Sequence, residues 1–66
     1  MPVVIIQMVA GRSLDQKRRL VSAITDAMVG IAGARRERTN VIIHEVEPEN
    51  WAHDGLLMGD QEKVTP

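Results

Sequence analysis

Two short apolar runs flank one amphipathic segment in this sequence. The first run, Val3–Val9, is apolar at every position except Gln7, and the second, Thr39 to Val46, is centred on Val41-Ile42-Ile43. β-Strands that are covered on both faces have this near-continuous apolar character. We therefore predict two short strands, each covered on both faces.

The segment between the runs carries apolar residues at the spacing of one face of an α-helix. Ser13 is a favourable N-cap, and Gln16 three residues later completes a capping box. Gly33 suits the C′ position that follows a helix. We predict a helix from about Leu14 to about Ala32. Its apolar stripe consists of Leu14, Leu20, Val21, Ile24, Ala27, Met28 and Ile31.

The order strand, helix, strand predicts a β-α-β unit, in which the strands are parallel and the crossover is right-handed. Pro48 ends the second strand, and the irregular segment after it suggests a hairpin around Gly55–Gly59 and then a frayed tail. The expected fold class is α/β, with one domain over residues 1–66 made of a single β-α-β unit and a short C-terminal hairpin.

Length and composition favour an oligomer. A domain of 66 residues buries only about 60% of the surface of its unfolded chain, and two strands under one helix are not stable alone. The sequence has no cysteine for a disulfide, while 44% of its residues are hydrophobic. Association between subunits is the remaining source of stability, so we expect an obligate homo-oligomer.

Charge and hydropathy exclude several classes of function. The net charge of −1 leaves no basic excess for nucleic acid. The apolar runs are too short to span a bilayer, and no positively charged region precedes the first, so we expect no membrane segment and a cytoplasmic protein. His44 and His53 do not have the spacing of metal ligands, so we expect no metal.

Pro2 is the first candidate for chemistry. A small second residue allows the initiator Met1 to be removed, which would leave the secondary amine of proline as the N-terminus. An α-amino group has a pKa of about 8, and removal from water or nearby cations lower it. Such an amine could act as a general base near pH ~7. Alternatively, Pro2 only begins an edge strand, where its missing N–H does no harm.

Arg12 is the second candidate, because it stands between Gly11 and the N-cap Ser13. A guanidinium in such a loop can bind a carboxylate with two parallel hydrogen bonds, although it could also be an ordinary surface arginine. Ten extended residues from Pro2 to Arg12 span roughly 33 Å. If both residues serve one site, a second subunit must therefore supply the arginine.

The features together resemble the 4-oxalocrotonate tautomerase family over nearly the whole chain, from Pro2 to about Gly59. The motifs that carry the resemblance are Pro2, Gly11-Arg12-Ser13, Asp15-Gln16-Lys17, the strand Val41-Ile42-Ile43-His44-Glu45, and the aromatic Trp51.

The resemblance implies that two subunits join their strands into a larger four-stranded sheet, and that three such dimers form a hexamer. It implies an isomerase of aromatic degradation, with Pro2 as the base that moves a proton between oxygen and carbon of a small 2-hydroxydienoate or 2-oxo acid. Arg12 of a neighbour would bind the substrate carboxylate, and Trp51 would form an apolar wall. No cofactor is implied.

One position departs from the family pattern. The best-known members carry an arginine immediately before the Val-Ile-Ile run, where this chain has Asn40. An asparagine can donate a hydrogen bond to a carbonyl but cannot neutralise a carboxylate. Arg38, two residues earlier, would share a face with Asn40 if the strand began early enough. We expect Asn40 and Arg38 to contact the substrate, with a weaker preference for dicarboxylates.

Two alternatives remain open. Some relatives add water to halogenated acrylates by means of a carboxylate just after the aromatic residue, a place occupied here by His53 and Asp54. Asp54-Gly55 is also an ordinary hairpin turn signal, which we favour. The other alternative is a catalytically silent oligomeric module, which would result if Met1 is retained and the proline nitrogen stays an amide.

Overall fold

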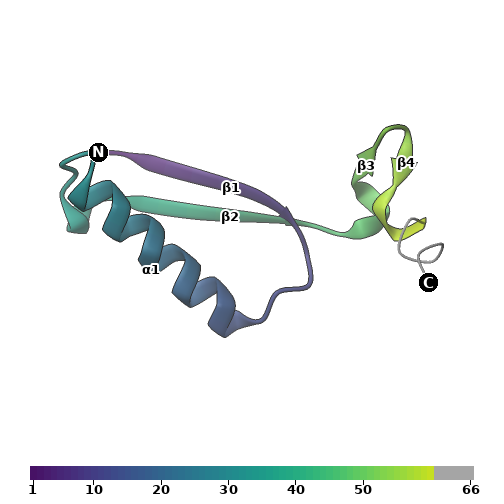
Figure 1. Ribbon diagram of the computed structural model, residues 1–66, viewed down its shortest axis with the longest axis horizontal. Coiled ribbons are helices and arrows are strands. Elements are labelled where there is room, and N and C mark those ends of the chain that lie inside the picture. Colours follow the sequence, from purple (N-terminus) through teal and green to yellow (C-terminus); the bar gives the residue numbers. More distant parts are fainter. Residues whose placement is uncertain (61–66) are drawn as a thin grey trace.

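In the computed structural model, which describes residues 1–60, one helix crosses a parallel pair of strands (Figure 1). Strand β1 (Val3–Val9) pairs along its whole length with β2 (Asn40–Val46), and helix α1 (Leu14–Gly30) joins them. The predicted β-α-β unit is confirmed. β1 has the predicted bounds, and β2 begins one residue later than predicted, because a short 3-10 helix, η1 (Arg36–Arg38), precedes it.

Helix α1 begins at the predicted capping box. The Ser13 hydroxyl accepts a hydrogen bond from the Gln16 backbone N–H at 3.1 Å, and the Gln16 side chain accepts one from the Ser13 N–H at 2.8 Å. Two of the N–H groups that a helix start leaves without partners are thus satisfied.

Helix α1 ends two residues before the predicted Ala32, although Ile31 and Ala32 still donate backbone bonds to the preceding turn. Gly33 has a φ of 73°, in the left-handed region, and it reverses the chain as expected of a C′ residue. The N–H of Ala34 then bonds to the carbonyl of Met28 at 3.0 Å, which closes the helix end.

The C-terminal part projects away from the β-α-β unit (Figure 1). After η2 (Pro48–Asn50), β3 (Ala52–His53) and β4 (Leu56–Leu57) form an antiparallel hairpin. Its turn is Asp54-Gly55, with φ values of 55° and 74°, so the hairpin is centred there and not on Gly55–Gly59. The expected frayed tail falls on residues 61–66, outside the described residues. The radius of gyration, 15.3 Å, exceeds the roughly 11 Å of a compact chain of this length.

Only one face of the sheet is covered. Val4, Ile6 and Met8 alternate toward α1 and are half-buried, as are Val41 and Ile43. On the other face, the exposed fractions are 53% for Val3, 57% for Ile5 and 43% for Ile42, and no residue of the range 1–60 is fully buried. The prediction of strands covered on both faces is therefore wrong for a single subunit, because one helix supplies only one layer.

The two glycines near the end of α1 give a matched test of this helix end. Gly33→Ala should lower the free energy of unfolding by about 1 kcal/mol, because a Cβ disfavours a left-handed backbone. No atom lies within 4 Å of the added Cβ at Gly33 or Gly30, so packing should not interfere. Gly30→Ala, inside the helix, should instead raise the free energy by about 0.5–1 kcal/mol.

Urea unfolding at one fixed protein concentration measures both changes, since the stability of an oligomer depends on concentration. Shifts of the same sign in the two variants would contradict the assigned helix end.

Candidate active site

Pro2 lies directly before β1, beside the start of β2. Its carbonyl oxygen accepts a hydrogen bond from the Asn40 backbone N–H at 3.0 Å, which extends the strand pairing by one residue. Pro2 itself is half-buried, whereas Met1 is 85% exposed. While Met1 is attached, the proline nitrogen is part of an amide and is not basic.

Asn40 and Arg38 lie at the same end of the sheet as Pro2. Asn40 is opposite Val3 in the strand register, and its side chain is exposed. Arg38 is the last residue of η1, and β2 begins only at Asn40. The early strand start that would place Arg38 on the same strand face as Asn40 is therefore absent. Its backbone N–H bonds to the carbonyl of Arg35 at 3.0 Å.

Three arginines gather in and before η1, but they differ in their partners. Arg35 forms an ion pair with Glu37 at 3.1 Å, and Arg36 forms one with Asp26 of α1. Arg38 forms no ion pair with any residue of the range 1–60. Its guanidinium is therefore the one in this group that no internal carboxylate neutralises.

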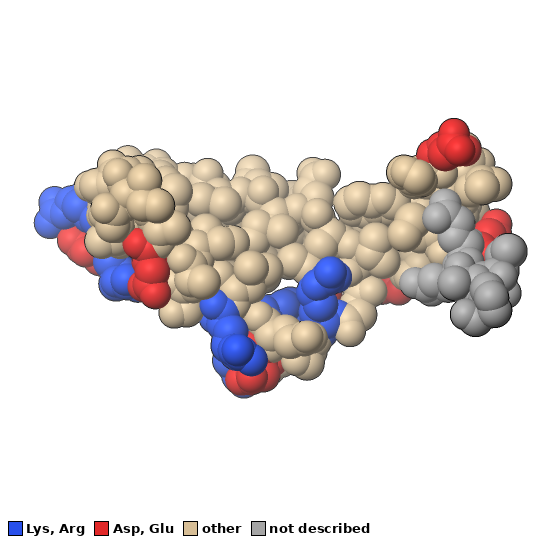
Figure 2. All heavy atoms as spheres, viewed as in Figure 1, with Lys and Arg blue, Asp and Glu red and all other residues tan. Residues whose placement is uncertain are grey.

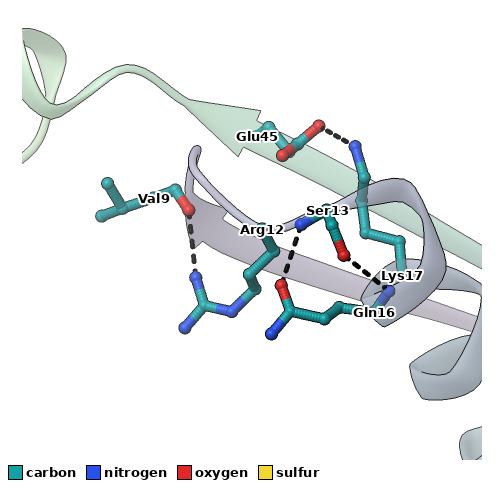
Figure 3. Close-up of polar contacts among 6 residues, drawn as sticks. All are labelled: Val9, Arg12, Ser13, Gln16, Lys17 and Glu45. Atoms are coloured by element: carbon teal, nitrogen blue, oxygen red, sulfur yellow. Dashed lines mark hydrogen bonds and ion pairs between the residues drawn. The ribbon is translucent and has the colours of Figure 1, made fainter.

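Arg12 lies beyond the opposite end of β1, in the turn that leads into α1 (Figure 3). Gly11 has a φ of 139°, a backbone region that glycine adopts readily. The Arg12 Nη1 donates a hydrogen bond to the Val9 carbonyl at 3.2 Å. No carboxylate among the described residues pairs with this exposed side chain, so most of its N–H groups are available to a ligand.

Trp51 lies past the C-terminal end of β2, where it follows η2 and precedes the hairpin. It is half-buried, and its carbonyl accepts a hydrogen bond from the Met58 N–H at 2.8 Å. His53 and Asp54 are exposed in the hairpin, and Asp54 occupies a left-handed turn position. This geometry agrees with the interpretation of Asp54-Gly55 as a turn.

The candidate residues thus form two groups at opposite ends of the sheet (Figure 1). Pro2, Arg38 and Asn40 lie at the start of the strands, and Arg12 and Trp51 lie beyond their ends. The seven residues of β1 alone span roughly 23 Å at the usual rise of a strand. One chain cannot bring the two groups into contact, as the sequence analysis predicted for Pro2 and Arg12.

Sequence reasoning missed one polar contact next to Arg12. Lys17 of α1 and Glu45 of β2 form an ion pair of 2.6 Å (Figure 3). Its members are 28 positions apart, so no local motif could have joined them. Within residues 1–60 no cluster of three or more histidine or carboxylate residues could hold a metal ion, and no helix is long and apolar enough to cross a bilayer.

Comparison with known proteins shows the family. The model of the Tautomerase family, described as tautomerase enzyme, matches residues 2–61. A 2-hydroxymuconate tautomerase of Bacillus subtilis strain 168 is 37% identical over 62 residues, which are 94% of this chain and 100% of the relative.

Solved structures agree in fold. A 4-oxalocrotonate tautomerase isozyme from Methylibium petroleiphilum superposes with a TM-score of 0.92 at 26% identity, over 97% of this chain and 100% of the other. A heterohexamer 4-oxalocrotonate tautomerase from Chloroflexus aurantiacus J-10-fl superposes with a TM-score of 0.86 at 32% identity, over 91% of this chain and 97% of the other. Because the family match begins at Pro2 and takes in both strands, the helix and the hairpin, the chain belongs to the tautomerase family and is an isomerase with the 4-oxalocrotonate tautomerase fold.

Proposed function

We propose that this chain, once Met1 is removed, interconverts the enol and keto forms of a small 2-hydroxydienoate or 2-oxo acid, with the Pro2 amine as general base. The observation that carries the proposal is the place of Pro2. The family match begins at this residue, and the fold holds it at an open end of the sheet behind an exposed methionine.

The reaction needs one base and no cofactor. The neutral Pro2 amine takes the proton of the enol hydroxyl, the O–H electron pair becomes part of the new carbonyl, and the π electrons move along the diene to a carbon. The resulting ammonium then delivers the proton to that carbon, so the base is regenerated. The hydrogen bond from Asn40 to the Pro2 carbonyl anchors the proline backbone while its nitrogen changes charge.

Arg12 of a neighbouring subunit binds the substrate carboxylate in this proposal. Its side chain has no internal carboxylate partner among the described residues, and a guanidinium can hold a carboxylate bidentately. The fixed positive charge also favours the movement of electron density toward that end of the substrate. Trp51 of the neighbour supplies the apolar wall, while Asn40 and Arg38 contact the other end of the substrate.

The proposed assembly is a homohexamer, formed as a trimer of dimers. Two sets of exposed apolar residues support association: the open sheet face of Val3, Ile5 and Ile42, and the projecting hairpin, where Leu56 is 56% exposed and Leu57 is 39% exposed. Exposed β-strands with apolar faces are surfaces that folded proteins normally cover. Water addition through His53 or Asp54 is not proposed, because the turn geometry accounts for Asp54-Gly55.

Replacing Pro2 tests the base. Protein whose free N-terminal proline is confirmed by intact mass should ketonise 2-hydroxymuconate and phenylenolpyruvate. The loss of ultraviolet absorbance of the enol measures the rate. Pro2→Ala should reduce kcat/KM by about 10²–10⁴-fold, the usual contribution of a positioned general base. Protein with an uncleaved extension before Pro2 is the control for a blocked amine and should be inactive. No turnover by verified free-proline protein would refute the proposed function.

Mixed assemblies test the shared site. Pro2→Ala and Arg12→Ala chains should each keep only a small residual activity alone, whereas refolding them together at a one-to-one ratio gives about one site in four with both native groups under random mixing. The activity of the mixed oligomers should therefore recover to about one quarter of the activity of the native protein. Each variant refolded alone is the control, and no recovery in oligomers shown to contain both chains would rule out a site shared between subunits.

Asn40 should set the preference between diacids and monoacids. Asn40→Arg should raise the ratio of kcat/KM for 2-hydroxymuconate over phenylenolpyruvate roughly tenfold, because a charge-assisted bond replaces a neutral one. Asn40→Gln keeps a neutral amide and should change the ratio by less than about twofold. An equal ratio in all three proteins would show that this position does not contact the second carboxylate.

A further inference from the structure

The Lys17–Glu45 ion pair is the least exposed of the three ion pairs that the described residues form. Its side chains are 26% and 31% exposed, whereas the members of the other two pairs are 56–71% exposed. The lysine Nζ lies 2.6 Å from Glu45 Oε1. The pair joins the first turns of α1 to the end of β2, next to the loop that carries Arg12 (Figure 3).

Neither charge is favourable where it lies without the other. Glu45 lies two and four residues after Ile43 and Val41 in β2, so it shares with them the sheet face that α1 covers. A carboxylate that is partly removed from water there needs a partner. Lys17 follows the helix N-cap by four residues, where the helix dipole disfavours a cation. Local stability therefore does not explain this placement of the two charges.

The pair anchors one side of the Arg12 loop. On the β1 side, the Ala10 N–H bonds to the Val46 carbonyl at 2.9 Å. On the α1 side, the Lys17 N–H bonds to the Ser13 carbonyl at 3.1 Å, and the Lys17 side chain reaches Glu45. The loop of residues 10–13 is thus held at both ends by two consecutive residues of β2.

Figure 2 shows Lys and Arg atoms in two places, at the left end of the molecule and along the lower edge over the N-terminal half of α1, with acidic atoms beside both. Arg12 has no acidic partner among the described residues. Glu45 therefore neutralises Lys17 and leaves Arg12 as an unpaired cation beside it.

We propose that Lys17 and Glu45 are positioning residues for Arg12, which fix the direction of its guanidinium and so strengthen binding of the substrate carboxylate. This inference rests on the proposed function, because it assumes that Arg12 is the carboxylate ligand. Neither member of the pair needs to touch the substrate. Loss of the pair should release the first turn of α1 from β2 and widen the range of Arg12 positions.

The principal test separates KM from kcat. Glu45→Gln and Lys17→Met should each raise KM for phenylenolpyruvate about tenfold, with less than about a threefold change in kcat. This rise is larger than the effect of losing an exposed ion pair and smaller than the effect of misplacing a binding group outright. Asp26→Asn is the matched control, because it breaks the Arg36–Asp26 pair at a distance from the Arg12 loop. It should leave both constants unchanged.

The reversed pair and a double-mutant cycle separate positioning from a general effect on folding. Lys17→Glu combined with Glu45→Lys should restore KM to within about threefold of the original, since the ion pair forms again in the opposite sense. In an Arg12→Ala background, Glu45→Gln should cause no further rise in KM. A rise as large as that in the native background would overturn the proposal, as would an unchanged KM in the single variants.

A binding measurement keeps this inference distinct from the proposed reaction. trans-Cinnamate is a planar monocarboxylate that cannot enolise, and calorimetric titration of the oligomer gives its Kd. If the native protein shows no turnover, the proposed function fails, but cinnamate still tests the pair. Binding about tenfold weaker in Glu45→Gln supports a positioning role. Equal affinity in the two proteins, or no binding to either, overturns it.

Discussion

The parallel pairing of β1 with β2 is the constraint on which the rest of the structure depends. Parallel strands cannot be joined by a tight turn, so the chain returns through α1 and covers one face of the sheet. The same pairing places the start of both strands at one end and the start of α1 at the other. Pro2 and Arg12 are consequently separated by the full length of β1. The open sheet face and, in the proposed assembly, the site shared between subunits have the same origin, since one helix covers only one face and one strand separates the two groups of residues.

Much of the fold could be predicted because its signals are local. The bounds of β1, the Ser13 capping box and the reversal at Gly33 depend on residues within one turn or one strand. The errors occur where distant parts decide the outcome. Nothing in the apolar pattern of β1 shows that one face is left open within the subunit, because alternation disappears whether the cover comes from the same chain or from another. The hairpin turns at Asp54-Gly55, the dipeptide that the sequence favoured as a turn, and not over the wider span Gly55–Gly59, because the left-handed pair closes the strands directly.

The candidate site divides in the same way. That Pro2 and Arg12 could not meet within one chain followed from strand geometry alone, and the structure agrees. Their possible chemistry, a base and a carboxylate ligand, followed from the residue types. Their assignment to one tautomerase reaction came from the resemblance, which geometry in a single chain does not test. The condition stated for Arg38, an early start of the second strand, is not met, because η1 intervenes before β2. The Lys17–Glu45 pair was out of reach of sequence reasoning, since only the folded crossover brings residues of α1 and β2 together.

The placement of the two groups of residues at opposite ends of one strand also bears on gene duplication. In the proposed assembly each chain contributes the base to one site and the arginine to another. A second copy of the gene would then need to retain only one end, as long as its partner retained the other. Two complementary chains could diverge separately, one in the residues around its amine and the other in those around its guanidinium. A substitution at one end would alter half of every mixed site without disturbing the strand pairing that holds both ends in place.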